Sequence, residues 1–301
     1  MANETWWGRT SLRIRTAQLW QIGSLDLLIE RTSSEFSVSW RHAARTVSSI
    51  ASVANAVTNG PTVNKRHLSN PSDAAAIRTA PNPASPLSPF IQAPFQTQAF
   101  AMHSSPSDDL TFTPVLPQAP LAVYFATPLT LEPNEKLTFG ACLPLEIKIE
   151  SGGSRVICAV PLEPFSKTWF GPNALYGELA LSINRTTVYS ALDETLPRPD
   201  QARAALTVRN SNGTPLTVDR LLIPCSRLSL FHSPQTGFWT DSITIDVRGD
   251  EHNIFQADRS LPREAGPSQF VQLVANPRAQ ERASINELAL KNFKNLFKER
   301  G

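Results

Sequence analysis

The sequence predicts an all-β protein: an antiparallel β-sandwich, either one large sandwich or two packed ones, with a C-terminal amphipathic helix. Three observations favour this class. Residues 1–40 alternate between apolar and polar side chains, which is typical of half-buried strands. From residue 110 onward, strand patterns separated by turn residues recur about every 8–12 residues, as in sandwiches. The 25 prolines and 18 % charged residues suit neither helical repeats nor coiled coils.

Residues 1–40 predict three or four antiparallel strands that pack with the main body. The clearest run is Phe36, Val38 and Trp40, which alternates with Ser37 and Ser39. Because successive side chains of a strand point to opposite faces, such a run buries one face. Trp20 and Trp40 lie within strand patterns, and we expect both in the core.

Residues 41–109 are expected to form an insertion or long loop. The Ala/Ser-rich stretch up to Gly60 predicts either one short helix or a linker. Residues 61–120 hold 11 of the 25 prolines, whereas residues 1–60 hold none. Proline lacks an amide donor and restricts the residue before it. We therefore expect residues 60–109 to be an extended surface loop or a partly disordered insertion.

Residues 110–280 predict the main β-sandwich. The sequence Ser151-Gly152-Gly153 is a turn signal, and it predicts a hairpin between the strands that flank it. The expected strands cover residues 121–126, 143–149, 155–160, 175–189, 204–209, 216–223, 228–232, 239–247 and 270–275.

Residues 281–301 predict a helix. Ser284 and Glu287 have the spacing of a capping box. An apolar stripe includes Leu288, Phe293 and Phe297, and Lys294 belongs to a basic set near the C-terminus. Two interpretations stay open: a helix docked on the body of the protein, or a basic amphipathic segment that meets a membrane surface or a partner.

Composition excludes several function classes. The net charge of +2 argues against a broad polyanion-binding surface. No window approaches the roughly 18 apolar residues of a membrane span. Three widely spaced cysteines and an N-terminal stretch without a signal-peptide pattern lead us to expect a cytoplasmic protein with reduced thiols.

The sequence offers no catalytic, cofactor-binding or metal-binding motif. The five histidines lack metal-ligand spacing, and neither a G-x-S-x-G elbow nor a phosphate loop is present. We therefore expect a protein that is not an enzyme and needs no cofactor. A hydrolase assembled from distant loop residues stays open, because sequence spacing does not reveal such a site.

An aromatic pair before a Gly-Pro turn is the most distinctive local feature. Trp169 and Phe170 precede the turn, and Glu178 starts the next strand. One interpretation is a corner that holds two sheets together. The other is a partner-contact site formed by Trp169, Phe170 and Glu178, because aromatic residues beside a charge suit such sites. Leu288, Phe293, Lys294 and Phe297 are the other contact candidates.

Several segments together resemble the prokaryotic family named domain of unknown function 432. The resemblance covers about residues 1–40 and 110–300, and Thr-Trp-Phe-Gly with the later Gly-Glu-Leu is its most specific part. It implies a β-rich, cytoplasmic protein without established catalytic residues. The main segments are 20–27, 167–171, 177–179, 208–210, 220–224 and 238–241.

The resemblance also implies a partner, because genes of this family are often found near genes of small mechanosensitive channels of the MscS type. Our leading hypothesis is a non-enzymatic protein-interaction module, specifically a soluble accessory or regulatory subunit that binds the cytoplasmic domain of such a channel. Gene neighbourhood is an association and not a mechanism. The alternative is a carbohydrate-binding or small-ligand-binding sandwich, with a cleft lined by Trp169 or Trp239.

Overall fold

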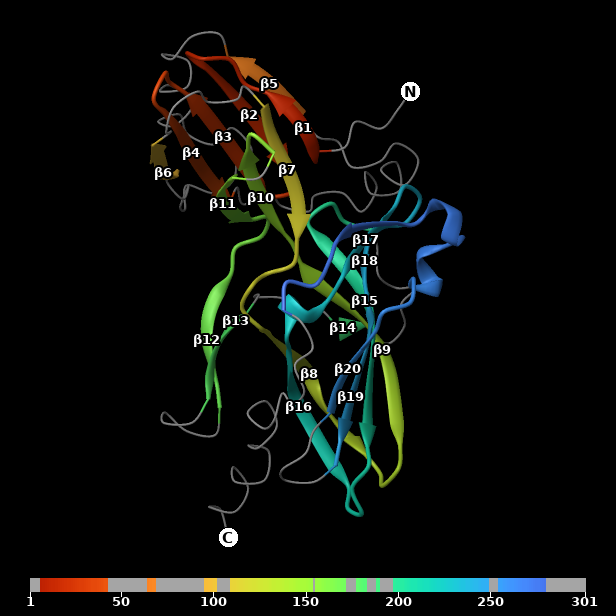
Figure 1. Ribbon diagram of the computed structural model, residues 1–301. Coiled ribbons are helices and arrows are strands. Elements are labelled where there is room, and N and C mark those ends of the chain that lie inside the picture. Colours follow the sequence, from red (N-terminus) through yellow and green to blue (C-terminus); the bar gives the residue numbers. More distant parts are fainter. Residues whose placement is uncertain are drawn as a thin grey trace, which may run out of the picture. The chain divides into compact units, whose positions relative to one another are not determined.

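The computed structural model describes residues 6–42, 64–68, 95–101, 109–153, 155–171, 177–182, 188–189, 197–248 and 254–279, and the protein is mostly β there (Figure 1). This confirms the all-β part of the prediction. The helical segments in these ranges are single 3-10 turns: η2 (Cys225–Arg227), η3 (Arg263–Ala265) and η4 (Ser268–Phe270). No helix within them is long and apolar enough to cross a membrane. The helix predicted at 281–301, with Leu288, Phe293, Lys294 and Phe297, lies outside the described residues.

The chain divides into two compact units, each made from two stretches of chain. Unit 1 comprises Met1–Pro114 and Glu146–Glu163, and unit 2 comprises Val115–Leu145 and Pro164–Gly301. The hairpin of residues 146–161, expected within one body of residues 110–280, thus belongs with the N-terminal strands. The reason is a long-range pairing, because its first strand lies beside a strand that starts at Asp109.

Unit 1 contains two sheets, which we name sheet A and sheet B. Sheet A has the order β1-β7-β10-β11, and sheet B has the order β5-β2-β3-β4-β6. The hairpin predicted around Gly152 is confirmed as β10–β11. The strands are β1 (Gly8–Ser11), β2 (Thr16–Ile22), β3 (Leu25–Arg31), β4 (Glu35–His42), β5 (Asn64–Leu68), β6 (Gln96–Ala101), β7 (Asp109–Val115), β10 (Glu146–Ser151) and β11 (Arg155–Pro161).

Two strands of sheet B lie within residues 60–109, where the sequence predicts an extended surface loop or a partly disordered insertion. β5 pairs with β2, and β6 pairs with β4, so both are edge strands. Their sequences, Asn-Lys-Arg-His-Leu and Gln-Thr-Gln-Ala-Phe-Ala, show little apolar alternation. Polar residues are common on edge strands, which explains why the sequence pattern did not predict these two.

The core of unit 1 lies between its two sheets. Trp20 of β2 packs edge-on against Phe112 of β7, with ring centroids 4.9 Å apart. This confirms Trp20 as a core residue, whereas Trp40 is only partly buried. Arg31 is fully buried at the end of β3 and donates a 2.6 Å hydrogen bond to the carbonyl oxygen of Leu12. The two sheets of unit 1 therefore contact each other through buried side chains.

Unit 2 also contains two sheets, named sheet C and sheet D. Sheet C has the order β12-β13-β8-β16, and sheet D has the order β14-β9-β15-β18-β17-β21, with β19 beside β15 and β20 beside β19. The strands are β8 (Leu121–Leu131), β9 (Lys136–Pro144), β12 (Ser166–Phe170), β13 (Glu178–Ser182), β14 (Val188–Tyr189), β15 (Gln201–Asn210), β16 (Leu216–Ile223), β17 (Leu230–Ser233), β18 (Gly237–Thr240), β19 (Ser242–Val247), β20 (Ile254–Asp258) and β21 (Gln272–Ala275).

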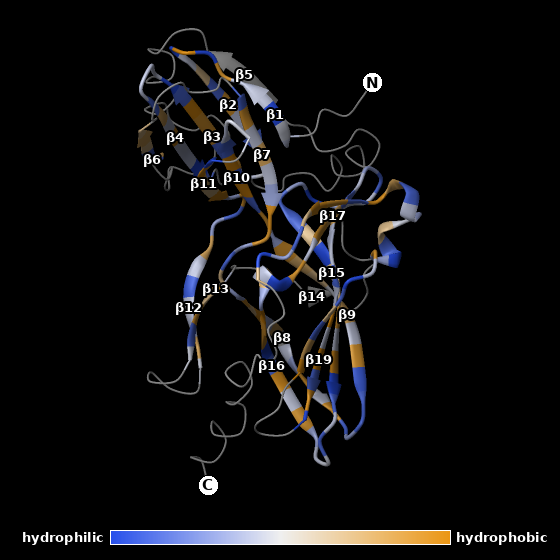
Figure 2. Cartoon of the chain, viewed as in Figure 1, coloured by the Kyte–Doolittle hydropathy of each residue, from blue (hydrophilic) through white to orange (hydrophobic). Residues whose placement is uncertain are grey.

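The sequence predicts purely antiparallel pairing, but unit 2 also contains parallel pairs. β13 pairs in parallel with β8, and β15 pairs in parallel with both β18 and β19. Between β15 and β18 the chain passes through β16 of the other sheet, and a long connection of this kind permits parallel pairing. Figure 2 shows polar and apolar residues alternating along β16 and β19, the pattern of strands with one buried face.

Asn210 joins the ends of four strands in unit 2. Its buried amide group donates hydrogen bonds to the carbonyl oxygens of Leu131, Glu132 and Thr214, at 2.9, 3.2 and 2.9 Å. Its side-chain oxygen accepts the amide N–H of Asn212 at 2.9 Å. One side chain therefore ties the β8–β9 turn to the β15–β16 turn.

Replacing the amide donor of Asn210 with an acceptor should destabilise the protein more than removing the side chain. Asn210→Asp directs a carboxylate at three carbonyl oxygens, whereas Asn210→Ala only leaves them without a donor. We expect both variants to lose at least about 2 kcal/mol of unfolding free energy, and the aspartate variant to lose more at neutral pH. Urea unfolding at pH 7 measures both; equal stability of the two variants would contradict this account.

Candidate protein-contact site

The β12–β13 hairpin carries all three candidate contact residues for which the structure gives a position. β12 and β13 pair antiparallel, with Phe170 opposite Glu178 and Trp169 opposite Leu179. Figure 1 shows the two strands as a green hairpin at the edge of unit 2. Since directly opposed residues share a face and neighbours alternate, the hairpin has a Trp169 face and a Phe170 face.

The Trp169 face is open to solvent. Trp169 is 45 % exposed and Leu179 is 52 % exposed. Lys167 lies on the same face, two residues before Trp169, and is also exposed. Among the described residues, Lys167 has no acidic side chain within ion-pair distance. This face therefore combines an exposed apolar pair with a cation.

The Phe170 face is packed. Phe170 is buried against Ala122, Ala180 and Leu222, which come from the other three strands of sheet C. The guanidinium carbon of Arg220 lies 5.0 Å from the centre of the Phe170 ring. Beside it, the hydroxyl groups of Tyr124 and Thr168 share a 3.4 Å hydrogen bond. We name Arg220, Phe170, Tyr124 and Thr168 the Arg220 cluster.

A break in strand register places the Arg220 cluster. β16 pairs with β8 through Val218 with Leu129 and through Arg220 with Tyr124, so residues 125–128 of β8 are opposite Asp219 alone. Pro128 lies within this bulge and has no N–H to offer the ladder. Bulges bend a strand and change the direction of the side chains beside them.

Glu178 shares the Phe170 face and is partly buried. Burial raises the pKa of its carboxyl group above the usual value. The acidic residue of the hairpin thus favours its neutral form more than an exposed glutamate does.

Gly177 allows the hairpin end to close. A Cβ atom there would lie 2.7 Å from the carbonyl oxygen of Phe170 and 2.8 Å from both the Gly171 Cα and the Trp169 Cε2 atoms. Two of these three contacts are with backbone, which cannot rotate away. Glycine is therefore required by close approach at this position.

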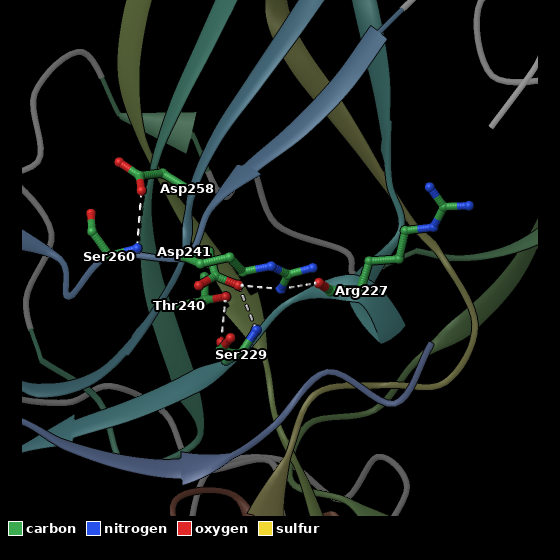
Figure 3. A network of polar contacts seen from close by, with 7 residues as sticks. Arg227, Ser229, Thr240, Asp241, Asp258 and Ser260 are labelled. Carbon is green, nitrogen blue, oxygen red and sulfur yellow. Dashed lines mark hydrogen bonds and ion pairs between the residues drawn. The ribbon is translucent and has the colours of Figure 1, made fainter. Parts of the chain in front are cut away.

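A second polar network surrounds Asp241, as Figure 3 shows. Asp241 is fully buried, and its Oδ2 atom accepts the Ser229 amide N–H at 2.6 Å and the Arg259 guanidinium at 3.2 Å. Its Oδ1 atom has no hydrogen-bond partner among the described residues. Burial raises the pKa of this carboxyl group, although the hydrogen bonds and the positive charge of Arg259 oppose that effect.

Trp239 is a core residue and not a wall of a ligand cleft. It is 3 % exposed, and the guanidinium carbon of Arg203 lies 4.1 Å from its ring centre. Its indole N–H donates to the Thr236 hydroxyl at 2.9 Å, and Arg203 donates to the Thr236 carbonyl oxygen. Trp239 therefore anchors β18 to β15, and its ring faces are not available for stacking.

The described residues offer little nucleophilic or metal chemistry. They contain no group of three or more His, Cys, Asp or Glu side chains able to hold a metal ion. Burial raises the pKa of the Cys158 thiol to about 12. Because the thiolate is the reactive form, Cys158 is a poor nucleophile. Burial also lowers the pKa of His42 and of His232.

A family model described as Protein of unknown function (DUF432) matches residues 6–293 of the chain. The chain belongs to this family. No curated protein and no solved structure matches it. The DUF432 match confirms the resemblance found in the sequence and extends it across residues 41–109.

The structure brings together segments of DUF432 resemblance that lie far apart in the sequence. Arg220, from the segment 220–224, stacks on Phe170, from the segment 167–171. Sequence reasoning singled out Phe170 but missed Arg220, Tyr124, Leu179 and Asp241. Leu179, Arg220 and Asp241 all lie in segments that carry the resemblance, and their membership of those segments was the signal that could have identified them.

Filling the space at Gly177 should open the hairpin end. We expect Gly177→Ala to cost about 1–3 kcal/mol of stability, because the added methyl group overlaps backbone atoms. The environment of Trp169 should change at the same time. Urea unfolding and the fluorescence difference between each protein and its Trp169→Phe counterpart measure both effects. Unchanged stability and an unchanged Trp169 signal would contradict the close approach.

The Asp241 network predicts a specific pH dependence. A carboxyl group whose pKa is higher in the folded protein binds protons preferentially there. Its contribution to stability is therefore favourable at acidic pH and is lost as the pH rises through the folded-state pKa. We expect the unfolding free energy of the natural protein relative to Asp241→Asn to fall from pH 4 upward and then level off. Arg259→Gln should enlarge this fall and extend it to higher pH, because Arg259 lowers the pKa of Asp241. A stability difference between the natural protein and Asp241→Asn that does not change with pH would contradict the assignment.

Proposed function

We propose that this protein is a non-enzymatic protein-interaction module that contacts its partner through the β12–β13 hairpin. The exposed pair of Trp169 and Leu179 carries the proposal. Large aromatic and aliphatic side chains standing together on a surface suit protein contacts, since their burial in a complex is strongly favourable. Roughly half of each side chain remains to be buried by a partner.

The partner we propose is the cytoplasmic domain of an MscS-like mechanosensitive channel, with the protein as its soluble accessory or regulatory subunit. The proposal starts from membership of the DUF432 family and from the gene neighbourhood that the resemblance implies. A regulatory effect requires different affinities for the closed and open channel, because equal affinity leaves the equilibrium unchanged. Carbohydrate or small-ligand binding, with a cleft lined by Trp169 or Trp239, is the alternative; Trp239 is buried, whereas Trp169 is exposed.

Two leucines of unit 2 provide a matched test. Leu179 on β13 and Leu273 on β21 are 52 % and 50 % exposed. We expect Leu179→Ser to weaken binding of the channel's cytoplasmic domain about tenfold or more, and Trp169→Ala to act in the same direction. Leu273→Ser should leave binding unchanged. Isothermal titration calorimetry gives the affinities, and circular dichroism verifies the fold of each variant.

Purification of the tagged protein from its host in mild detergent tests the partner itself. Recovery of the channel at fixed stoichiometry is expected. Recovery of a different protein at fixed stoichiometry would reject the channel as the partner. Equal binding by the Leu179→Ser and Leu273→Ser variants would reject the hairpin as the contact site.

A further inference from the structure

Four arginines of the described residues lie over aromatic rings, and one of them differs from the others. Arg31, Arg41 and Arg203 stack on Phe36, Phe95 and Trp239. Each of these three guanidinium groups also donates to an oxygen of the protein: the Leu12 carbonyl, the Asp26 carboxylate and the Thr236 carbonyl, respectively.

Arg220 stacks on Phe170 but has no such acceptor among the described residues. It is partly exposed. Asp219, its neighbour on β16, points to the opposite face of the strand, and no ion pair joins the two. The planar group therefore holds donors that the described protein does not use, and a guanidinium group presents five N–H donors in a fork that matches a carboxylate.

The position of Arg220 is fixed before any ligand binds. The Phe170 ring supports one face of the guanidinium group. The register break in β8 places Arg220 of β16 opposite Tyr124. A supported side chain loses less conformational entropy on binding than a free one. The exposed hydroxyl of Tyr124 lies on the same face of sheet C and is a further donor.

The charge around the hairpin favours an anionic ligand. Among the described residues, neither Lys167 nor Arg220 has an acidic partner within ion-pair distance. Lys167 on β12 and Arg220 on β16, which β8 separates from the hairpin in the strand order, thus offer cations without acidic partners on opposite faces of sheet C. A segment that wraps the hairpin edge would meet Arg220 on one side and Lys167 on the other.

We propose that Arg220 binds a carboxylate group of the partner, so that the segment bound by the β12–β13 hairpin is acidic. This inference rests on the proposed function and adds the chemistry of the partner. Trp169 and Leu179 contact the apolar residues of that segment, and Arg220 and Lys167 contact its aspartate or glutamate side chains.

The test uses the full-length protein and a fluorescein-labelled peptide of about ten residues in which glutamate alternates with threonine and leucine. A second peptide carries glutamine in place of each glutamate. Fluorescence anisotropy at low and moderate salt gives the affinities. The variants are Arg220→Gln, Arg220→Lys and, as a charge-matched control, Lys136→Gln at an exposed position of β9.

We expect the glutamate peptide to bind and the glutamine peptide to bind at least tenfold more weakly. Arg220→Gln should weaken binding of the glutamate peptide about tenfold. Arg220→Lys should also weaken it, because lysine keeps the charge but not the planar fork. Lys136→Gln should leave it unchanged. Circular dichroism and urea unfolding verify that each variant is folded.

Equal binding of the two peptides, or equal effects of Arg220→Gln and Lys136→Gln, would overturn the inference. So would Arg220-dependent binding of a phosphoserine peptide by a protein that ignores the glutamate peptide, since this would identify a phosphorylated segment. The measurement needs no channel. If the channel is not recovered but the peptide still binds through Arg220, the proposed channel is rejected and the acidic segment stands. If the channel is recovered but peptide binding does not depend on Arg220, the acidic segment is rejected and the channel stands.

Discussion

Unit 2 depends on the hydrogen bonds of one amide group. Asn210 binds carbonyl oxygens of the β8–β9 turn and of the chain leading into β16, and it lies at the end of β15, the strand at the centre of sheet D. These bonds fix where β16 begins relative to β8. The register of β16 in turn sets Arg220 opposite Tyr124. A buried side chain in one sheet thus positions a partly exposed arginine in the other.

Buried and half-buried arginines recur as packing elements in both units. In each case an aromatic ring covers one face of the guanidinium group, which has a modest desolvation cost compared with an ammonium group. This arrangement lets short strands of mixed composition form a core without a continuous apolar stripe.

Many of the strands were predictable from local pattern, and their partners were not. Alternation predicted β3 and β4, strand-like runs between turns predicted β15 and β16, and the double glycine predicted the β10–β11 hairpin. Pairing depends on residues far apart in the chain, so neither the assignment of β10 to unit 1 nor the parallel partners of β15 were visible. At the candidate site, the sequence indicated Trp169 and Phe170 as a pair. Which of them faces solvent depends on β8 and β16, whose contacts only the structure supplies.

The interleaving of the two units has a consequence for how the chain is made. Unit 1 needs residues 146–163, and unit 2 has already begun at residue 115. At about 5–20 residues per second, the ribosome takes roughly 2–10 s to pass from residue 114 to residue 163. During that interval sheet A lacks β10 and β11. In unit 2, β8 still lacks its partner β16, and β9 still lacks its partner β15. Neither unit completes its sheets as a contiguous piece of chain, so no single cut or fusion point separates one unit from the other in a gene.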